Sequence, residues 1–573
     1  MLDPRTASRR ISVSALLSPF VVLGIATAQE GGATGPRTRG TTPPATQEPK
    51  PQEPKAGQPE APKAEPKKPD AAPPDRARQS PEPTFHYEPV HSRYLRLDPF
   101  DRYGRRTRWN PLTMSDGTGE YPIIGSAGLF DVYNTNKWKG DLPMWGENTF
   151  VAAELVSANL FEGRNKAGAN DETELRSTEF LSIEAFHGDT VFRPPTWRVR
   201  STLAFDFRYV DNAVVDGFDP DAAVQELFGE ALLWDCDPYL DFGSVRVGRQ
   251  AFASDFRNFI FTDQNDGVQL FGSLNESKID FQLAFFDLVA KDPISNLNRG
   301  FEDRDQTFLA ANVFFEDLVA TGYKVEFTFQ WAHDTAVQDA TVDAYYLGFN
   351  GEGRIGGLEV AHAFYWMTGT DDQNIVTAAE TDINAFMAAL EVAIPDDWRR
   401  YVFSGLYASG DSDVNDDKGG GFDSVFDNPN FAGGAFGYFD RQAIAAQGVP
   451  IVNTNSFYPN LRTKANDAPN SVNPGLIILH GGVEADLSNY WSVAFNAAYL
   501  HFADTNVLEA VFGQSVSSSF GIDLSLAAKY RPLGVDNCII TPGVQVLFST
   551  GGLEDLTGDS ALAALFVNAV IVL

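Results

Sequence analysis

Charged side chains alternate with apolar ones in the stretch TWRVRSTLAFDFRYV, residues 196–210. In a strand successive side chains point to opposite faces, so Arg198, Arg200, Asp206 and Arg208 share one face and the aromatic and aliphatic residues share the other. Guanidinium groups bind carboxylates through paired hydrogen bonds, which suits sugar acids and other anionic solutes. The stretch also exceeds the usual strand of about 5–6 residues and is long enough to cross a bilayer, which takes about 9–11 residues.

The same alternation places further charged side chains on the inner faces of other predicted strands: Glu226, Glu230, Arg246, Lys324, Glu326, Asp523, Lys529 and Arg531. A charge facing lipid at the bilayer midplane would cost about 2–4 kcal/mol, so these residues should face a lumen or lie at its rims. Two outcomes stay open, a lumen that selects anions and a mixed-charge lumen in which arginines and carboxylates pair. Arg249, also a candidate pore-lining residue, has the parity of the outward Val245 and Val247, and therefore requires a bulge or a place at the strand rim.

Two further kinds of site can be sought in the sequence, a metal site and an enzymatic site. Oxygen ligands at alternate positions in the segment 410–474 suggest Ca²⁺, with Asp411, Asp413, Asn415 and Asp417 as candidates. An EF-hand loop would need glycine sixth and glutamate twelfth, where the chain has Asp416 and Phe422, so a solvated acidic loop is the alternative. The seven histidines form no recognisable catalytic or metal-binding pattern, and we predict no other cofactor and no enzyme.

The elements that would position these residues form a meander of strands from residue 149 to 573. We predict about eighteen, an even number as in bacterial single-chain barrels: 149–161, 176–188, 196–210, 223–235, 240–250, 266–273, 277–289, 306–315, 322–332, 341–350, 355–368, 382–393, 398–409, 475–487, 490–503, 518–531, 537–549 and 561–573. Connections after even strands are mostly short, and those after odd strands are longer, above all 410–474. The prediction is an all-β, transmembrane, antiparallel up-and-down barrel with both ends in the periplasm and 410–474 outside the cell.

Residues 1–148 differ in composition from the strand region that follows them. Residues 1–28 have a positive start, a mostly apolar middle and the small-x-small site Ala26-Thr27-Ala28, as in a signal peptide. Residues 29–83 are rich in Pro, Lys and Glu and predict a disordered periplasmic linker. Residues 84–148 predict a partly ordered segment, either a plug in the barrel or an arm on its surface. The net charge of -33 argues against a nucleic-acid partner.

Residues 226–271 resemble the alginate export family of outer-membrane barrels. The resemblance is carried by Gly248-Arg249-Gln250 at the end of a strand and by the DGVQL segment at 266–270, with similar features at 407–411 (YASGD) and 518–532 (SSFGIDLSLAAKYRP). It implies an eighteen-stranded barrel whose lumen carries Arg and Lys and passes an anionic polysaccharide outward. The chain differs from the family in its acidic composition and in having Leu573, not an aromatic residue, in the last position.

The expected function is an outer-membrane channel for passage or export of anionic saccharides. Two alternatives stay open: a general small-solute porin, and a barrel that serves as an anchor or cell-envelope interaction protein. The expected partners are outer-membrane lipid and an anionic saccharide or other small solute, with the cell wall or export machinery as further candidates through the tether. Cys236 and Cys538 should lie five strands apart near one rim, too far for a disulfide, and should therefore stay free thiols.

Overall fold

The computed structural model describes residues 138, 140, 143–167, 171–188, 194–211, 216–236, 241–335, 340–463, 468–532 and 537–573. The predicted signal peptide, linker and most of the segment 84–148 lie outside these residues. The chain divides into two units, 1–75 and 76–573, and the second contains all of the structure that follows. No helix in the described ranges is long and apolar enough to cross a membrane.

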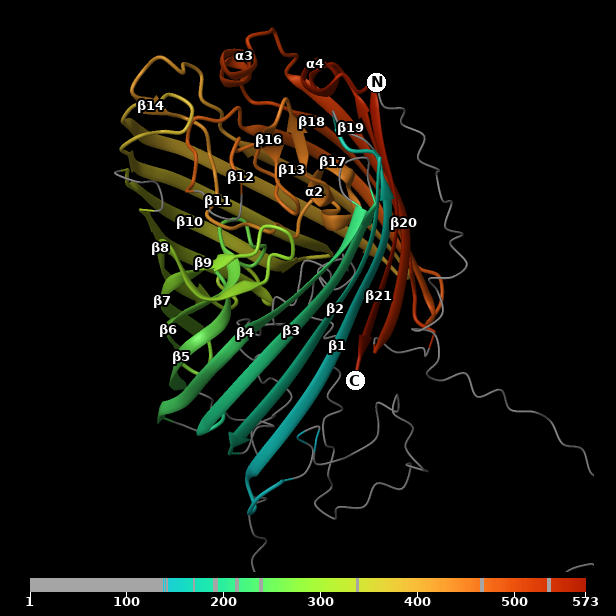
Figure 1. Ribbon diagram of the computed structural model, residues 1–573. Helices are drawn as coiled ribbons and strands as arrows, with labels where there is room; N and C mark the ends of the chain where they lie inside the picture. The colour runs from blue at the N-terminus through green and yellow to red at the C-terminus, as the bar shows by residue number, and fades with distance from the viewer. Residues whose placement is uncertain are drawn as a thin grey trace, which may run out of the picture. The chain divides into compact units, whose positions relative to one another are not determined.

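Eighteen antiparallel strands form one closed barrel, because β1 pairs with β2 on one side and with β21 on the other (Figure 1). The strands are β1 (Thr149–Arg164), β2 (Glu172–His187), β3 (Trp197–Asp211), β4 (Asp216–Asp235), β5 (Phe242–Ala253), β6 (Thr262–Leu274), β7 (Ile279–Lys291), β8 (Asn298–Phe315), β9 (Tyr323–Asp334), β10 (Val342–Ile355), β11 (Leu358–Asp371), β12 (Thr381–Asp396), β13 (Arg399–Ala408), β17 (Leu476–Asp486), β18 (Trp491–His501), β19 (Ser519–Tyr530), β20 (Cys538–Ser549) and β21 (Ala561–Val572).

The predicted barrel of eighteen strands is confirmed, and each predicted segment corresponds to one observed strand, although 355–368 also includes the last residue of β10. The largest differences are at the end of the barrel that carries the longer connections, which we call the long-connection end. There β4 starts at Asp216 and β8 at Asn298, several residues before the predicted positions. At the opposite end, residues 356–357 and 397–398 alone join their strands. Cys236 and Cys538 are free thiols, as predicted.

Inner and outer faces follow the sequence alternation. On β3, Leu203, Phe205 and Phe207 are 37%, 39% and 43% exposed on the outer wall. Arg200 and Asp206, on the opposite face, are buried inside the barrel. A closed antiparallel sheet satisfies its backbone groups by pairing around the ring, so the outer wall can be apolar throughout.

The connection between β13 and β17, residues 409–475, folds into the barrel. It carries β14 (Lys418–Gly419), the 3-10 helix η4 (Gly434–Phe436), the short helix α2 (Tyr438–Arg441), and the hairpin of β15 (Ile444–Ala446) and β16 (Val449–Val452). Its apolar residues, among them Phe422, Phe426 and Tyr458, share one core with inward residues of the wall. We call it the infolded connection.

This corrects the expectation that 410–474 is a loop exposed outside the barrel. Asp440, which should be accessible in such a loop, is only 3% exposed, and α2 contacts β19, β20 and β21. The physical reason is that the aromatic residues of the connection are more stable packed against the inner wall than in water. The helices α3 (Asn506–Phe512) and α4 (Gly552–Thr557) belong to two other connections at the same end of the barrel.

Candidate functional site: the lumen wall and the infolded connection

Arginines of the inner wall are paired with carboxylates on neighbouring strands. Arg200 on β3 lies 2.8 Å from Glu226 on β4, and Arg198 lies 2.7 Å from Glu230. Arg246 on β5 contacts the same oxygen of Glu230 at 2.7 Å. The register brings these residues together, since Arg198 and Arg246 each stand directly opposite Glu230. Glu184 of β2 contacts both Arg198 at 3.9 Å and Arg200 at 3.3 Å, so the five predicted site residues belong to one ion-pair network.

A second group of ion pairs lies nearer the long-connection end of β1, β2 and β3. Arg176 contacts Asp206 at 2.6 Å, and Arg208 contacts Glu174 at 2.8 Å. Arg164 of β1 also contacts Glu174, at 3.0 Å. The predictions included Asp206 and Arg208 but missed their partners. The alternating stretch 172–186, ETELRSTEFLSIEAF, carries the signal that would have found them, because all of its charged residues except Glu179 also fall at even positions.

The remaining predicted residues lie apart from these groups. Lys324 contacts Asp280 at 2.9 Å, and Glu326 accepts a hydrogen bond from Asn350 at 3.0 Å. Lys529 is buried on β19, and Arg531, just after that strand, donates to Ser492 Oγ at 2.9 Å. The lumen thus holds several separate polar groups rather than one continuous row of cations.

Arg249 is almost fully buried on β5, although its parity along the strand is that of the outward residues. It is paired with Leu227 and Asp266 across the sheet, and Leu227 is exposed on the outer wall. Its guanidinium makes two hydrogen bonds to Asp266, at 2.9 and 2.7 Å, and lies 4.8 Å from the ring of Phe301. The guanidinium also donates to the carbonyl oxygen of Val224 at 3.2 Å. A pore-lining role for Arg249 stays a prediction.

Close contacts between neighbouring strands explain the glycines of the Gly248-Arg249-Gln250 and DGVQL motifs. Gly248 and Gly267 stand opposite each other across β5 and β6. Gly248 has φ 120°, and a Cβ there would lie 2.4 Å from the carbonyl oxygen of Leu227. A Cβ on Gly267 would lie 2.3 Å from the carbonyl oxygen of Phe285. The motifs therefore place glycine where neighbouring strands approach too closely for a side chain.

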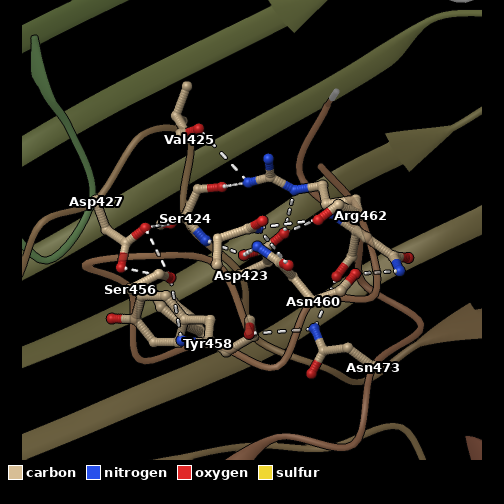
Figure 2. Close-up of polar contacts among 12 residues, drawn as sticks. Asp423, Ser424, Val425, Asp427, Ser456, Tyr458, Asn460, Arg462 and Asn473 are labelled. Atoms are coloured by element: carbon tan, nitrogen blue, oxygen red, sulfur yellow. Dashed lines mark hydrogen bonds and ion pairs between the residues drawn. The ribbon is translucent and has the colours of Figure 1, made fainter. Parts of the chain in front are cut away.

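Inside the infolded connection, Asp423 and Arg462 form a buried ion pair at 2.9 Å (Figure 2). Asp423 also accepts hydrogen bonds from the backbone N–H of Asn470 at 2.8 Å and from Asn460 Nδ2 at 3.2 Å. Arg462 donates to the carbonyl oxygen of Ser424 at 2.9 Å. Burial raises the pKa of Asp423, and the charge of Arg462 opposes that rise. This network gives the connection a fixed shape within the lumen.

The infolded connection is also bound to the wall. Arg441 of α2 contacts Glu162 of β1 at 2.6 Å, and Asp523 of β19 accepts a hydrogen bond from the backbone N–H of Phe439 at 2.8 Å. Between the connection and β17–β19 lies a cavity lined by polar and apolar side chains, including Asp440, Asn496, Asp523 and Ser525. Asp523, predicted as a lumen residue, therefore positions α2.

The candidate calcium ligands do not gather into one site. Asp411 is buried, whereas Asp413, Asn415 and Asp417 are exposed. Asp413 accepts hydrogen bonds from the backbone N–H and Nδ2 of Asn415, at 3.0 and 3.2 Å. Among the residues that the structure describes, no group of three or more His, Cys, Asp or Glu side chains is arranged to hold a metal ion. Calcium binding here stays a prediction.

Asp411 and Asn473 close the base of the infolded connection. The backbone N–H of Asp411 donates to the carbonyl oxygen of Asn473 at 2.8 Å. Its carboxylate accepts a bond from the N–H of Gly420 at 3.3 Å. Burial raises the pKa of Asp411 to about 6, and the nearby carboxylates of Asp416 and Asp504 act in the same direction.

No family model matches the chain, and no curated protein sequence matches it. Solved structures with a similar course of the chain include three proteins from two bacteria. Pseudomonas aeruginosa OpdK with vanillate is 11% identical, with a TM-score of 0.43 over 74% of this chain and 98% of that chain. Pseudomonas aeruginosa OccK2 (OpdF) in complex with glucuronate is 12% identical, with a TM-score of 0.42 over the same shares. Acinetobacter baumannii OccAB4 is 10% identical, with a TM-score of 0.42 over 75% of this chain and 99% of that chain.

Proposed function

We propose that this protein is an outer-membrane channel for small solutes. The observation that carries the proposal is the separation of side chains on a closed barrel, apolar on the outer wall and charged on the inner wall. A barrel that closes on itself leaves no unpaired strand edge, and this is the one β-architecture that can span a bilayer. Strands of this length, apolar toward lipid and polar toward a lumen, are what a channel requires.

The ion pairs of the wall support a mixed-charge lumen of modest selectivity. Arg198, Arg200 and Arg246 each contact a carboxylate of the wall itself. A passing anion would have to compete with that carboxylate, so these arginines attract anions less than unpaired ones would. We therefore favour a porin for small polar solutes over a channel dedicated to one anion.

Anionic saccharides are the finer form of the proposal. Half-buried guanidinium groups such as those of Arg198 and Arg208 can exchange one carboxylate partner for another, and a uronate offers the same two oxygens as glutamate. The resemblance of residues 226–271 to the alginate export family points the same way. Export of a polysaccharide would need a wide lumen, and the infolded connection occupies part of it.

The infolded connection also gives reason to keep a second candidate, a barrel that anchors another cell-envelope component. Its packing against the inner wall from β5 to β21 is extensive, as the shared core shows. A lumen closed by such packing would not conduct, and the function would then belong to the N-terminal segment.

Conductance across planar lipid bilayers separates these candidates. We would compare the full chain with a variant in which residues 424–470 are replaced by a short Gly/Ser linker, after showing by heat-modifiable gel migration that both barrels are folded. The channel proposal predicts conductance in the full chain and a clear increase in the variant. Reversal potentials in a KCl gradient near zero support a small-solute porin, and anion preference supports saccharide passage. Conductance absent from the full chain and present in the variant supports the anchor.

A further inference from the structure

A cluster of polar side chains lies on the outer wall of the barrel, on β1 and β2. Glu179 Oε1 accepts hydrogen bonds from the hydroxyls of Ser157 at 2.8 Å and Ser177 at 2.9 Å. Asn159 Oδ1, at 2.8 Å, is the alternative acceptor for the single Ser177 hydroxyl proton, and Asn159 Nδ2 donates to Ser157 Oγ at 2.9 Å. The four residues, which we call the outer polar cluster, form a closed hydrogen-bonded group across the two strands.

The alternation of the strands shows that the outer polar cluster faces away from the lumen. Its residues alternate with Ala158, Leu160, Thr178 and Phe180, which are buried inside the barrel. Across the sheet, Glu179 stands opposite Phe205 of β3, an exposed residue of the outer wall. Glu179 also lies near the middle of β2, seven residues after Glu172 and eight before His187. The cluster is thus at mid-height of the surface that the proposed function turns toward lipid.

Elsewhere the outer wall is apolar at comparable heights. The outward side chains in the middle of other strands are large and hydrophobic, as shown by Leu203, Phe285, Phe329, Leu347, Phe403 and Leu526. The outer polar cluster is therefore a local departure from the pattern that lipid contact imposes. Lipid tails offer no hydrogen bond to a carboxylate, and ionisable residues at such depth usually face protein or water.

Glu179 keeps a capacity for further hydrogen bonds. Both hydroxyl bonds go to Oε1, and among the described residues no hydrogen bond to Oε2 is formed. On the neighbouring strand β21, Ala569 stands opposite Asn159. Ala563 and Gly163 are further small residues of this outer face, which also carries the larger Phe161, Leu565, Val567 and Ile571. Small residues allow two membrane-embedded surfaces to approach until their polar groups meet.

We propose that the outer face of β1, β2 and β21 is where two copies of this barrel meet in the membrane. The outer polar cluster contains both acceptors and donors, so it can pair with itself. A two-fold axis along the membrane normal between β1 and β2 would set Glu179 of one copy beside Asn159 of the second copy, and the reverse. Closed two-fold pairs are the commonest symmetric assemblies, and they need this self-complementarity. The inference rests on the proposed membrane location.

The first test is the mass of the protein after extraction into lipid nanodiscs, measured for the full chain and for Glu179→Leu. Heat-modifiable migration of each protein reports whether the barrel is folded, independently of its assembly. We expect the mass of two chains for the full chain and of one chain for Glu179→Leu. A full chain that is folded and single overturns the proposal. If Glu179 faces lipid and not a second copy, Glu179→Leu will have the same mass as the full chain. That result also overturns the proposal.

The second test locates the interface. In a background of Cys236→Ser and Cys538→Ser, Ser157→Cys should form an intermolecular disulfide under mild oxidation in native membranes. Phe329→Cys, an outward residue at a similar height on β9, should not. Cross-linking of both positions to the same extent would show random collision and overturn the assigned face. Cross-linking of Ser157→Cys to a different protein would assign the face to that protein and overturn the two-fold pair. Failure of the barrel to enter the membrane fraction would instead count against the proposed function.

Discussion

Arg462 lies within the infolded connection with its guanidinium against Asp423, and both side chains are almost fully buried. Removing one partner of such a pair leaves a buried charge uncompensated, which costs about 3–5 kcal/mol. We therefore predict that Arg462→Met makes the infolded connection sensitive to protease in detergent, while the barrel remains heat-modifiable. The cleavage sites, found by mass spectrometry, should fall between residues 409 and 475.

Arg299→Met provides the matched control, because Arg299 pairs with Glu302 at the surface and both are at least half exposed. Such a pair contributes about 0–1 kcal/mol. Equal protease sensitivity in the two variants would show that the pair of Asp423 and Arg462 does not hold the connection in place.

The raised pKa of Asp411 predicts a pH dependence of the infolded connection. Its carboxyl has a pKa of about 6 in the closed structure against an ordinary 3.8, so the closed state binds the proton more tightly. For this group, closure is most favourable below the ordinary value, weakens as the pH rises toward about 6, and then stays constant. Openings of the channel should therefore be more frequent at pH 7.5 than at pH 4.5.

Asp411→Asn should remove the contribution of Asp411 to the difference in opening frequency between the two pH values. Asp413→Asn, at an exposed residue of the same segment, should retain that difference. The measurement is single-channel recording of each protein at the two pH values. A pH response of Asp411→Asn equal to that of the unchanged chain would contradict the assignment.

Arg208 is the wall arginine whose replacement best reports on selectivity. It is half-buried and pairs with Glu174, whereas Arg200 lies among Glu154, Glu184 and Glu226 and is required to neutralise them. We expect Arg208→Glu to fold and to shift the reversal potential toward cation preference. Arg354→Glu, at an exposed residue near the opposite end, should leave the potential unchanged, and an equal shift would argue against a lumen role for Arg208.

At the scale of the strands, the contact of Gly248 with its neighbour predicts a sharp dependence on side-chain size. Gly248→Ala would place a Cβ against Leu227 in a conformation that costs about 1–3 kcal/mol even without the clash. Gly229→Ala, on the adjacent β4, meets no atom within 4 Å and should be tolerated. Urea unfolding in detergent should show the loss for the first variant alone, and comparable midpoints would contradict the proposed close approach.

The strands and their inner and outer faces could be predicted because the evidence for them is local. Alternation in residues 196–210 fixes the parity of Arg200 and Phe205 without knowledge of the neighbouring strand. The ion-pair partner of each charged side chain could not be predicted in this way. The contact between Arg208 and Glu174 depends on the register of β2 and β3, which the sequence of one strand does not contain.

The fold of the infolded connection could not be predicted because its apolar residues have no regular spacing along the sequence. Its buried residues Phe422, Phe426 and Phe431 have irregular spacing, and most of its structure is neither helix nor strand. Its length and acidic start suggested a solvated loop. The signal that could have corrected this is its content of aromatic residues, which a loop in water would have no reason to keep.

For the molecule as a whole, the outer wall predicts that position along the strand decides the cost of a charge. Phe205→Arg, near the middle of β3, should lower the free energy of unfolding in a lipid bilayer by about 2–4 kcal/mol. Phe218→Arg, at an exposed residue near the start of β4, should cost about 0–1 kcal/mol. Urea titration in lipid vesicles measures both, and equal costs would contradict the membrane orientation of the barrel.

The pairing of β1 with β21 has a consequence for how the protein is made. These strands are the first and last of the ring, and Ala564 lies opposite Arg164 although 400 residues separate them along the chain. The ribosome therefore releases a chain whose ring cannot yet have closed, and until β21 arrives β1 presents an unpaired edge open to aggregation. A message truncated before residue 561 would yield a product that can never complete the ring. The cell can thus distinguish finished from unfinished chains by one event, the joining of the two ends.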